Sequence, residues 1–438
     1  MRETLVKTEE FKDSPLGKIP ADWEVLTFED VSTVRQGLQI AISRRFKDYK
    51  PGRYIYITVE YLNNIGNSHL LEFIESPGNR VICHQDDVLV TRTGATGKII
   101  TDVEGVFHNN FFLVDYDRSK VNRDYLVCYL NLEQIQKEIK LRAGTTTIPD
   151  LKHRDFYSLT FLRPPLAEQE KIALILKSCD ETIAHTSSLI AKLKQMKAGL
   201  LHDLLTRGLD ENGELRDAIG HPEQFKDSLL GRIPKDWEVV KLVDHISLPN
   251  GQLDPKQQPY CNWVLIAPDH IESETGRILN LQTAAEQNAI SGKYGFQSGD
   301  VLYSKIRPYL RKAVLANREG LCSADMYPLR PQPTIVSRFL LELILGEDFS
   351  RFATAVSMRS GFPKINREEL SEYQLALPTY KEQQRIAEIL DTYDTRIRSE
   401  EAYRDKLKLQ KQGLMHDLLT GKVRVKDADK FTSVGDTV

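Results

Sequence analysis

Residues 11–25 read FKDSPLGKIPADWEV and residues 225–239 read FKDSLLGRIPKDWEV, so twelve of fifteen positions are identical at an offset of 214 residues. A second match, GLLHDLLT at 199–206 and GLMHDLLT at 413–420, has the same offset. So do the dipeptides Glu168-Gln169 and Glu382-Gln383. A fixed period of this kind indicates duplication of one structural unit. The 438-residue chain is therefore expected to consist of two units of 214 residues and a short polar tail.

The middle of each unit has diverged. Residues 26–145 and 240–357 share little beyond an acid-led strand, DVLV at 87–90 and DVLY at 300–303. Alternating and β-branched patterns predict strands at 54–59, 87–93, 107–114, 262–267, 300–305 and 312–316. Helices are expected over 122–142 and from about 335 to 357. Similar ends around different middles suggest one scaffold that presents two different recognition surfaces.

A long helical pattern follows Pro164-Pro165 and recurs after Pro378. Apolar side chains return there at alternating spacings of four and three, which is the 3.5-residue period of a coiled-coil seam. The expected seam consists of Ile172, Leu176, Ile183, Ile190, Leu193, Leu200, Leu204, Ile386, Leu390, Ile397, Leu407, Leu414 and Leu418. Two equivalent helices would pair about a pseudo-two-fold axis, and hence antiparallel. The alternative is that each helix packs only on its own domain.

These patterns predict an α+β fold with two tandem mixed α/β domains, joined by two long helices that form an antiparallel coiled coil. The expected segments are a first domain at 1–165, a first spacer helix at 166–207, a second domain at 208–378, a second spacer helix at 379–421 and a polar tail at 422–438.

Composition argues against several classes of protein. No apolar run approaches the ~18 residues of a membrane span, and the start of the chain has no apolar core of a signal peptide, so we expect a cytoplasmic protein. The five cysteines are far apart and form no CxxC pair, which argues against a zinc site or a disulfide framework. The net charge of −3 is low for a DNA-binding domain, so any basic surface must be local.

Two stretches are locally basic. Residues 35–53 carry six cations against one acid, and residues 303–318 carry five cations and no acid, with Tyr303 and Tyr309 interleaved. Such cations attract phosphate, and arginine can bond guanine edges in the major groove. Either stretch is equally compatible with an ordinary solvated surface.

Three loops add polar candidates. RTGATGK at 92–98 follows a strand but lacks the first Gly and the final Ser/Thr of a P-loop, so it is either a simple turn or a loop laid against a DNA backbone. GTTTI at 144–148 and SGFPKI at 360–365 can contact phosphate or serve as loop caps. The candidate DNA contacts are Arg35, Arg44, Arg45, Arg92, Thr93, Lys98, Thr145, Thr146, Lys305, Arg307, Tyr309, Arg311, Lys312, Arg359, Ser360 and Lys364.

No catalytic or metal-binding motif is recognisable. No G-x-G-x-x-G follows a strand, and Pro149-Asp150 is not followed by the acid-x-Lys pair of a metal-dependent nuclease. His202-Asp203 and His416-Asp417 are neighbours in a helix, where side chains point about 100° apart and cannot share one site. We therefore expect no catalytic residue, no metal site and no cofactor on this chain.

Together these motifs resemble a known family. The G-x-I-P-x-D-W-E-V segment (17–25 and 231–239), the Pro-x-x-x-Glu-Gln-x-x-Ile helix start and the LHDLLT helix end are similar to those of the specificity subunits of type I restriction–modification systems. The resemblance covers essentially the whole chain.

The resemblance implies that 1–165 and 208–378 are target recognition domains, each reading one half of a split double-stranded DNA target. The helices would set the spacer and dock two methyltransferase (M) subunits, and motor-nuclease (R) subunits would complete the complex. S-adenosylmethionine, ATP and Mg would bind those partners, and this chain would be non-catalytic. Two rival interpretations are a methyltransferase fused to its own recognition domains and a coiled-coil scaffold that does not bind DNA.

Overall fold

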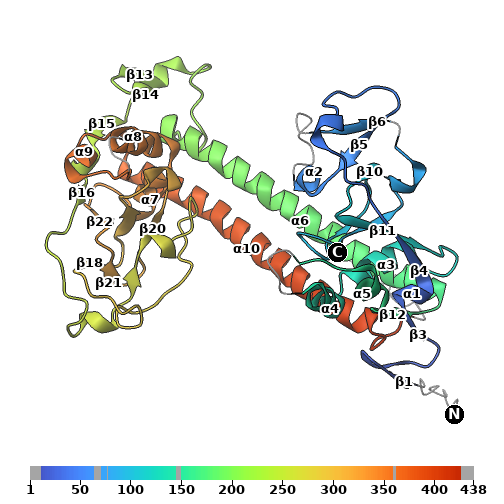
Figure 1. Cartoon of the computed structure of the whole chain (residues 1–438). Coiled ribbons are helices and arrows are strands. Elements are labelled where there is room, and N and C mark those ends of the chain that lie inside the picture. Colours follow the sequence, from blue (N-terminus) through green and yellow to red (C-terminus); the bar gives the residue numbers. More distant parts are fainter. Residues whose placement is uncertain (1–10, 64–70, 76, 145–148, 359–361, 426–438) are drawn as a thin grey trace, which may run out of the picture. The chain divides into compact units, whose positions relative to one another are not determined.

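The computed structural model describes residues 11–63, 71–75, 77–144, 149–358 and 362–425. It divides into two units: unit 1 comprises Met1–Thr186 and Ala402–Val438, and unit 2 comprises Ser187–Glu401. The division falls within both long helices, α6 (Leu166–Thr206) and α10 (Tyr380–Leu419) (Figure 1). Each unit therefore contains one half of each long helix.

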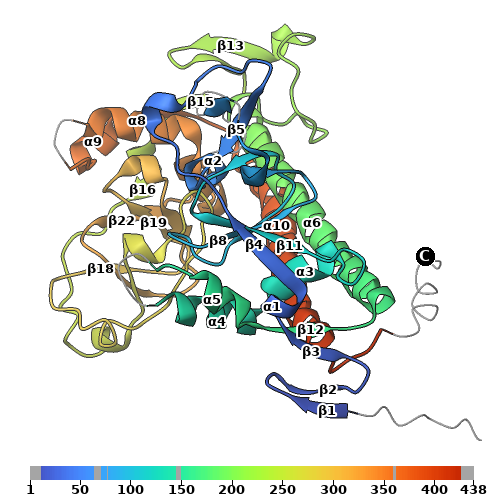
Figure 2. The ribbon, with the colours of Figure 1, turned by 45° about the vertical axis from the view of Figure 1, so that its right-hand side comes forward.

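Unit 1 contains two four-stranded sheets, ordered β6-β5-β10-β7 and β4-β11-β8-β9, and the pairs β1-β2 and β12-β3 (Figure 2). Its strands are β1 (Phe11–Ser14), β2 (Gly17–Pro20), β3 (Glu24–Thr27), β4 (Ser32–Gln36), β5 (Arg53–Ile57), β6 (Phe73–Glu75), β7 (Ile82–Cys83), β8 (Val88–Thr91), β9 (Ile99–Ile100), β10 (Gly105–Phe107), β11 (Phe111–Tyr116) and β12 (Thr160–Arg163). Its shorter helices are α1 (Phe28–Val31), α2 (Val59–Asn63), α3 (Arg123–Leu130), α4 (Glu133–Ala143) and α5 (His153–Tyr157).

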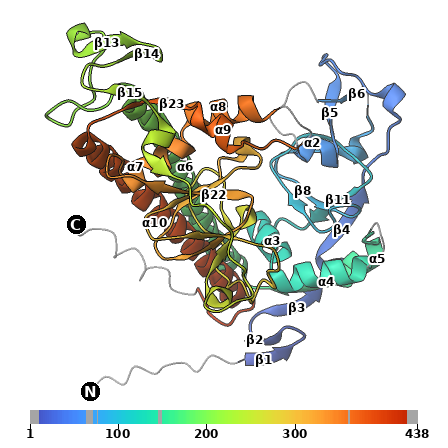
Figure 3. The ribbon, with the colours of Figure 1, turned by 90° about the vertical axis from the view of Figure 1, so that its left-hand side faces the viewer.

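Unit 2 contains sheets ordered β16-β22-β19-β20 and β17-β21-β18, and the pairs β13-β14 and β15-β23 (Figure 3). Its strands are β13 (Phe225–Ser228), β14 (Gly231–Pro234), β15 (Glu238–Lys241), β16 (Ile246–Ser247), β17 (Leu265–Ile266), β18 (Tyr294–Phe296), β19 (Val301–Ser304), β20 (Ala313–Leu315), β21 (Gly320–Cys322), β22 (Met326–Pro331) and β23 (Gln374–Leu377). Its shorter helices are α7 (Ser337–Leu345), α8 (Glu347–Ser357) and α9 (Arg367–Ser371).

The two units share one topology even where their sequences differ. The sheet β4-β11-β8-β9 of unit 1 corresponds strand by strand to β16-β22-β19-β20 of unit 2. In the other sheet, the parallel pair β5–β10 corresponds to the parallel pair β17–β21. The duplication therefore extends through the diverged middles, where the apolar pattern is kept although the residues have changed.

Several expected elements are shorter or divided. The strand expected at 107–114 is two strands, β10 and β11, because the chain turns between them. The helix expected at 122–142 is divided into α3 and α4: the Asn131 side chain donates to the Val127 carbonyl and ends α3. The helix expected at 335–357 is divided at Gly346, whose N–H bonds the Leu343 carbonyl. The strand expected at 262–267 is reduced to β17, because a 3-10 turn occupies Tyr260–Asn262.

Within each unit the two helix halves run antiparallel. In unit 2, Lys194 pairs with Glu401 and Lys197 with Asp394 at 2.8 Å. In unit 1, Asp180 pairs with Lys411 at 2.5 Å. Because 180 and 394, like 197 and 411, are 214 residues apart, the two units form the same ion pair with the helices exchanged.

The expected seam is buried mainly near the helix ends, where it joins the domain cores. Ile172 and Leu176 lie in the core of unit 1, and Ile386 and Leu390 lie in the core of unit 2. Of the remaining seam positions, Ile190, Leu204, Ile397 and Leu418 are buried, and Ile183, Leu193, Leu200 and Leu407 are half-buried. Leu414 departs from the expected seam: it is exposed, and Met415 packs on the core instead. A straight α-helix drifts from a strict 3.5-residue repeat by about 20° per heptad, which shifts the buried face.

Candidate nucleic-acid interface

Each unit is anchored by a buried tryptophan from the repeated segment. In unit 1, the indole of Trp23 donates to Glu168 at 3.1 Å, and Arg424 donates to both Glu168 and Asp22. Unit 2 repeats this arrangement with Trp237, Glu382, Arg216 and Asp236. Here Glu382 accepts hydrogen bonds from the indole of Trp237 at 2.9 Å and from Arg216 at 2.7 Å, and Arg216 also donates to Asp236. The repeated Asp-Trp and Glu motifs thus form one charge cluster in each unit, in which the tryptophan and the glutamate are buried and the aspartate is half-exposed.

The glutamine of each repeated Glu-Gln pair fixes the entry to a neighbouring helix. Gln169 accepts a hydrogen bond from the Asn122 N–H at 2.9 Å, and Gln383 accepts one from the Val336 N–H at 2.9 Å. The same side-chain amides donate to backbone carbonyls, including that of Pro164 in unit 1. Both glutamines are fully buried. These motif residues therefore position the framework and are not available to a ligand.

Sequence comparison missed the arginines of the two clusters. Arg216 and Arg424 are 208 residues apart, so they fall out of the 214-residue register, and Arg424 lies in the segment expected as a polar tail. Its side chain is only 6% exposed. A glycine follows each long helix in the sequence and could have indicated these places. In the structure, Gly208 and Gly421 have left-handed φ angles of +63° and +72°. A Cβ on Gly208 would lie 2.4 Å from Trp237, so the chain must pass close to the cluster.

Two arginine candidates of unit 1 are held by the fold. Arg45 donates to the Ile40 carbonyl and to Glu72 at 2.8 Å. Arg92 forms a bidentate pair with Asp150, at 2.8 Å to each carboxylate oxygen. Thr93 also donates to Asp150 at 2.7 Å. Burial alone would raise the pKa of Asp150, but the hydrogen bonds from Thr93 and Arg92 hold it below its usual value. Arg92 and Thr93 therefore stabilise the loop that follows β8. All three candidates, Arg45 included, are already paired within the protein.

Other candidates of unit 1 face solvent. Arg44 and Lys98 are exposed. Tyr49, in the same basic stretch as Arg44, is 70% exposed. Arg35 is intermediate, because it donates to the Arg80 carbonyl at 3.1 Å. The candidates Thr145 and Thr146 of unit 1, and Arg359 and Ser360 of unit 2, lie outside the described residues.

Arg311 and Lys312 of unit 2 are also held by the fold. Arg311 donates from Nε to the Leu345 carbonyl at 2.8 Å, so it caps the C-terminus of α7, and it pairs with Glu274 at 3.3 Å. Lys312 donates to the Pro268 carbonyl at 2.8 Å. They lie in a basic stretch but, like Arg92, are satisfied inside the protein.

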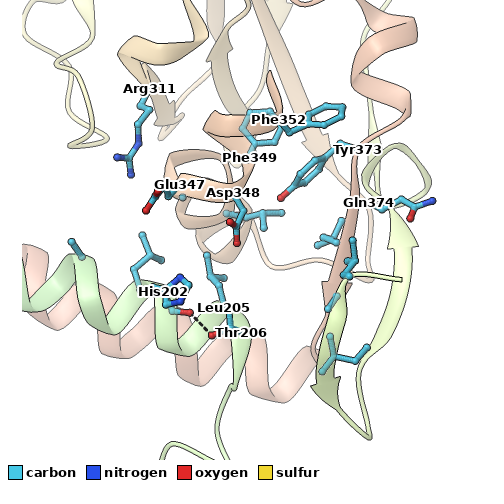
Figure 4. Close-up of a pocket in the computed structure, with 18 of the residues that line it drawn as sticks. His202, Leu205, Thr206, Arg311, Glu347, Asp348, Phe349, Phe352, Tyr373 and Gln374 are labelled. Carbon is cyan, nitrogen blue, oxygen red and sulfur yellow. Dashed lines mark hydrogen bonds between the residues drawn. The ribbon is translucent and has the colours of Figure 1, made fainter. Parts of the chain in front are cut away.

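Arg311 borders a cavity of about 570 Å³ between α6, α8 and β23 in unit 2 (Figure 4). Glu347, in the first turn of α8, is one of the residues that line it. The equivalent place in unit 1 is bridged, because Gln412 of α10 donates to Glu133 of α4 at 3.0 Å. In unit 2, the residues at the 214-residue offset from Gln412 and Glu133 are Ala198 and Glu347. An alanine cannot reach the carboxylate, so no equivalent bridge forms beside the cavity.

The remaining candidates of unit 2 lie together at the end of β19. Ile306 forms a backbone bridge with Lys364, and the Arg307 N–H donates to the Pro363 carbonyl at 2.8 Å. Arg307 is exposed, has a left-handed φ of +47°, and lies 5.4 Å from the ring centre of Phe362. Tyr309 is 50% exposed on the same loop. A cleft of about 340 Å³ adjoins this loop. Arg307, Tyr309 and Lys364 therefore form a basic, aromatic surface suited to nucleic acid, with the buried Lys305 next to it in the chain.

The chain matches the family described as type I restriction modification DNA specificity domain, over residues 20–195 and again over 234–409, and so belongs to this family. It is 26% identical to the type I restriction enzyme MjaVIII specificity subunit of Methanocaldococcus jannaschii, over 96% of this chain and 97% of that protein. It is 31% identical to the EcoDI specificity subunit of Escherichia coli, over 57% of this chain and 58% of that protein.

The fold has a solved counterpart. A chain from a study of complex assembly and conformational transition in the type I restriction–modification system aligns with a TM-score of 0.57 and 17% identity, covering 92% of this chain and 99% of the other. The protein is thus a specificity subunit with two recognition domains, and its role is recognition rather than catalysis.

The described ranges hold neither a group of metal-ligating side chains nor a membrane-spanning helix. No three His, Cys, Asp or Glu side chains are grouped there to hold a metal ion. None of the helices in those ranges is long and apolar enough to cross a membrane.

Proposed function

We propose that this specificity subunit reads a bipartite double-stranded DNA target, one half with the recognition domain of unit 1 and the other with that of unit 2. The observation that carries the proposal is the contrast within the repeat. One framework, with the same buried tryptophan cluster, occurs twice, and the strand-end loops that it supports differ in charge and shape. Different loops on equivalent frameworks are what two half-sites of different sequence require.

We further propose that α6 and α10 set the spacer between the half-sites and dock two methyltransferase subunits, with motor-nuclease subunits completing the restriction complex. The length of the helices supports this role: 41 and 40 residues correspond to roughly 60 Å each. S-adenosylmethionine, ATP and Mg²⁺ would bind the partner subunits. The chain would act inside the cell, where its DNA target lies.

The direct test is to express the chain with its methyltransferase partner and sequence the methylated sites. We expect an interrupted, asymmetric sequence, and we expect replacement of the β19-end loop of unit 2 to change only one half of it. Methylation by the chain alone with S-adenosylmethionine would favour the fused methyltransferase instead. Absence of any DNA binding by the complex would favour a plain scaffold.

A further inference from the structure

The two units place opposite charges at the same backbone bridge. In unit 1, Thr93 bridges Asp150, and the Leu151 N–H donates to the Arg92 carbonyl at 2.9 Å. In unit 2, Ile306 bridges Lys364, and the Ile365 N–H donates to the Lys305 carbonyl at 3.0 Å. Lys305 therefore takes the place of Arg92, and Lys364 takes the place of Asp150. An arginine–aspartate pair in unit 1 is replaced by two amines in unit 2.

Lys305 is a buried cation that forms no ion pair within the described part of the chain. The residue is only 7% exposed. Its ammonium lies 4.8 Å from the ring centre of Tyr327 and 5.9 Å from that of Tyr294. Burial and the neighbouring Lys364 lower the pKa of Lys305, and attraction by Asp325 opposes them. The rings stabilise the charge but accept no conventional hydrogen bonds, and Asp325 attracts the ammonium without forming an ion pair with it in the described part of the chain.

The surroundings add exposed cations to this buried one. Lys364 is exposed and, among the residues that the structure covers, forms no ion pair. Arg307 projects beside it from a left-handed backbone conformation, which is strained for a residue other than glycine. Within the described residues, the cluster therefore combines a mostly buried lysine without an ion pair, two exposed cations and exposed rings at one strand end.

We propose that Lys305 and Lys364 together hold a backbone phosphate of the DNA at the half-site read by unit 2, and that Asp150 closes the equivalent position of unit 1. This inference rests on the DNA-reading function proposed above. A phosphate supplies both the negative charge and the acceptor oxygens that the two amines lack. In unit 1 the Asp150 carboxylate already fills both roles for Arg92. Unit 2 therefore makes a sequence-independent contact at a position where unit 1 makes none.

The experiment measures binding of the complex with its methyltransferase partner to a duplex carrying the methylated target, across a salt series. Lys364→Gln should weaken binding roughly tenfold and reduce the slope of log affinity against log salt by about 1. The loss should be the same for targets altered in the second half-site. Lys364→Asp rebuilds the acid–base pair of unit 1 with Lys305 and should weaken binding further. Lys305→Met should act in the same direction in complexes that stay folded by circular dichroism.

The matched control is Arg318→Gln. Arg318 belongs to the same basic stretch and is exposed, and its guanidinium contacts its neighbour Asn317. Its removal should leave the salt slope unchanged. An equal loss of affinity in the control would overturn the proposed phosphate contact in favour of general electrostatic attraction of DNA. Wild-type affinity in both Lys364 variants would also overturn it. A loss confined to one base pair would mean that Lys364 reads a base. If the wild-type complex itself binds no bipartite target, the proposed function fails rather than the proposed phosphate contact.

Discussion

Around Trp23 in unit 1 and Trp237 in unit 2, the same four kinds of group meet: an indole, a glutamate, an aspartate and an arginine. At the ends of β8 and β19, the equivalent positions carry a paired Arg92 in one unit and, in the other, a Lys305 that forms no ion pair with any residue the structure describes. The first contacts are buried and mutually dependent, so changing one group leaves the others unsatisfied. The loop positions lie at the edge of the sheet, where new chemistry can be presented without disturbing the core.

The largest effect is expected when the chain is shortened to residues 1–218, which removes the domain of unit 2. The core of unit 1 includes Leu418 and Val425 from the end of the chain, so residues 1–218 alone would leave it open. We predict that this fragment dimerises, because the second copy supplies an equivalent helix end. Arg216, retained in the fragment, can then take the role of Arg424. With its methyltransferase partner, the dimer should modify an interrupted palindrome of the first half-site.

The ion pairs of the long helices give this prediction a control. In the dimer, Asp180 of one copy should face Lys197 of the other, as Asp180 faces Lys411 and Asp394 faces Lys197 in the whole chain. Asp180→Lys should weaken the dimer, and the exchange Asp180→Lys with Lys197→Asp should restore it. Solution mass and methylated-site sequencing are the measurements. A stable monomer, or an asymmetric target, would contradict the equivalence of the two units.

The buried clusters should respond equally in both units. Glu382→Ala removes the acceptor of the Trp237 indole and the buried carboxylate partner of Arg216, which keeps only the half-exposed Asp236, and loss of one partner from a buried ion pair costs about 3–5 kcal/mol. Glu168→Ala should cost a similar amount in unit 1. Urea unfolding monitored by circular dichroism measures both, with exposed Glu388→Ala on α10 as the control. A cost at one site only would show that the clusters are not equivalent.

Within unit 2, two arginines of one basic stretch should have opposite roles. Arg311→Ala removes hydrogen bonds to the Leu345 carbonyl and should reduce the free energy of unfolding by about 1–2 kcal/mol, with little change in DNA affinity. Arg307→Ala should leave stability nearly unchanged and weaken DNA binding by about 1–3 kcal/mol if Arg307 reads a base. Thermal unfolding and anisotropy titration separate the two. The assignment fails if the two phenotypes are exchanged.

The smallest expected effect concerns the cavity beside α8. Ala198→Gln gives unit 2 the glutamine that unit 1 has at Gln412, and it should donate to Glu347 as Gln412 does to Glu133. We expect a gain in the free energy of unfolding of about 0.5–1 kcal/mol. Ala198→Leu, which fills space without a donor, is the matched control. An equal gain from leucine would attribute the effect to apolar burial rather than to the missing bridge.

The sequence by itself determined the duplication, the two long helices and the absence of a recognisable catalytic motif. A repeat and an apolar period are properties of the order of residues, so they can be read without coordinates. The family resemblance rested on the same local motifs. Helix division at Asn131 and Gly346 was also encoded locally, but a continuous apolar pattern across each break concealed it.

Only the tertiary structure decided which cations are free. Arg45 and Arg311 lie in stretches as basic as that of Arg307, yet each, like Arg92 in its loop, is bound to a carbonyl or carboxylate distant in sequence. Arg216 and Arg424 were invisible as cluster members because their partners lie 166 and 256 residues away. Local composition fixes how many charges a segment carries. The direction of each side chain, and the partner that satisfies it, depend on how distant strands and loops are brought together.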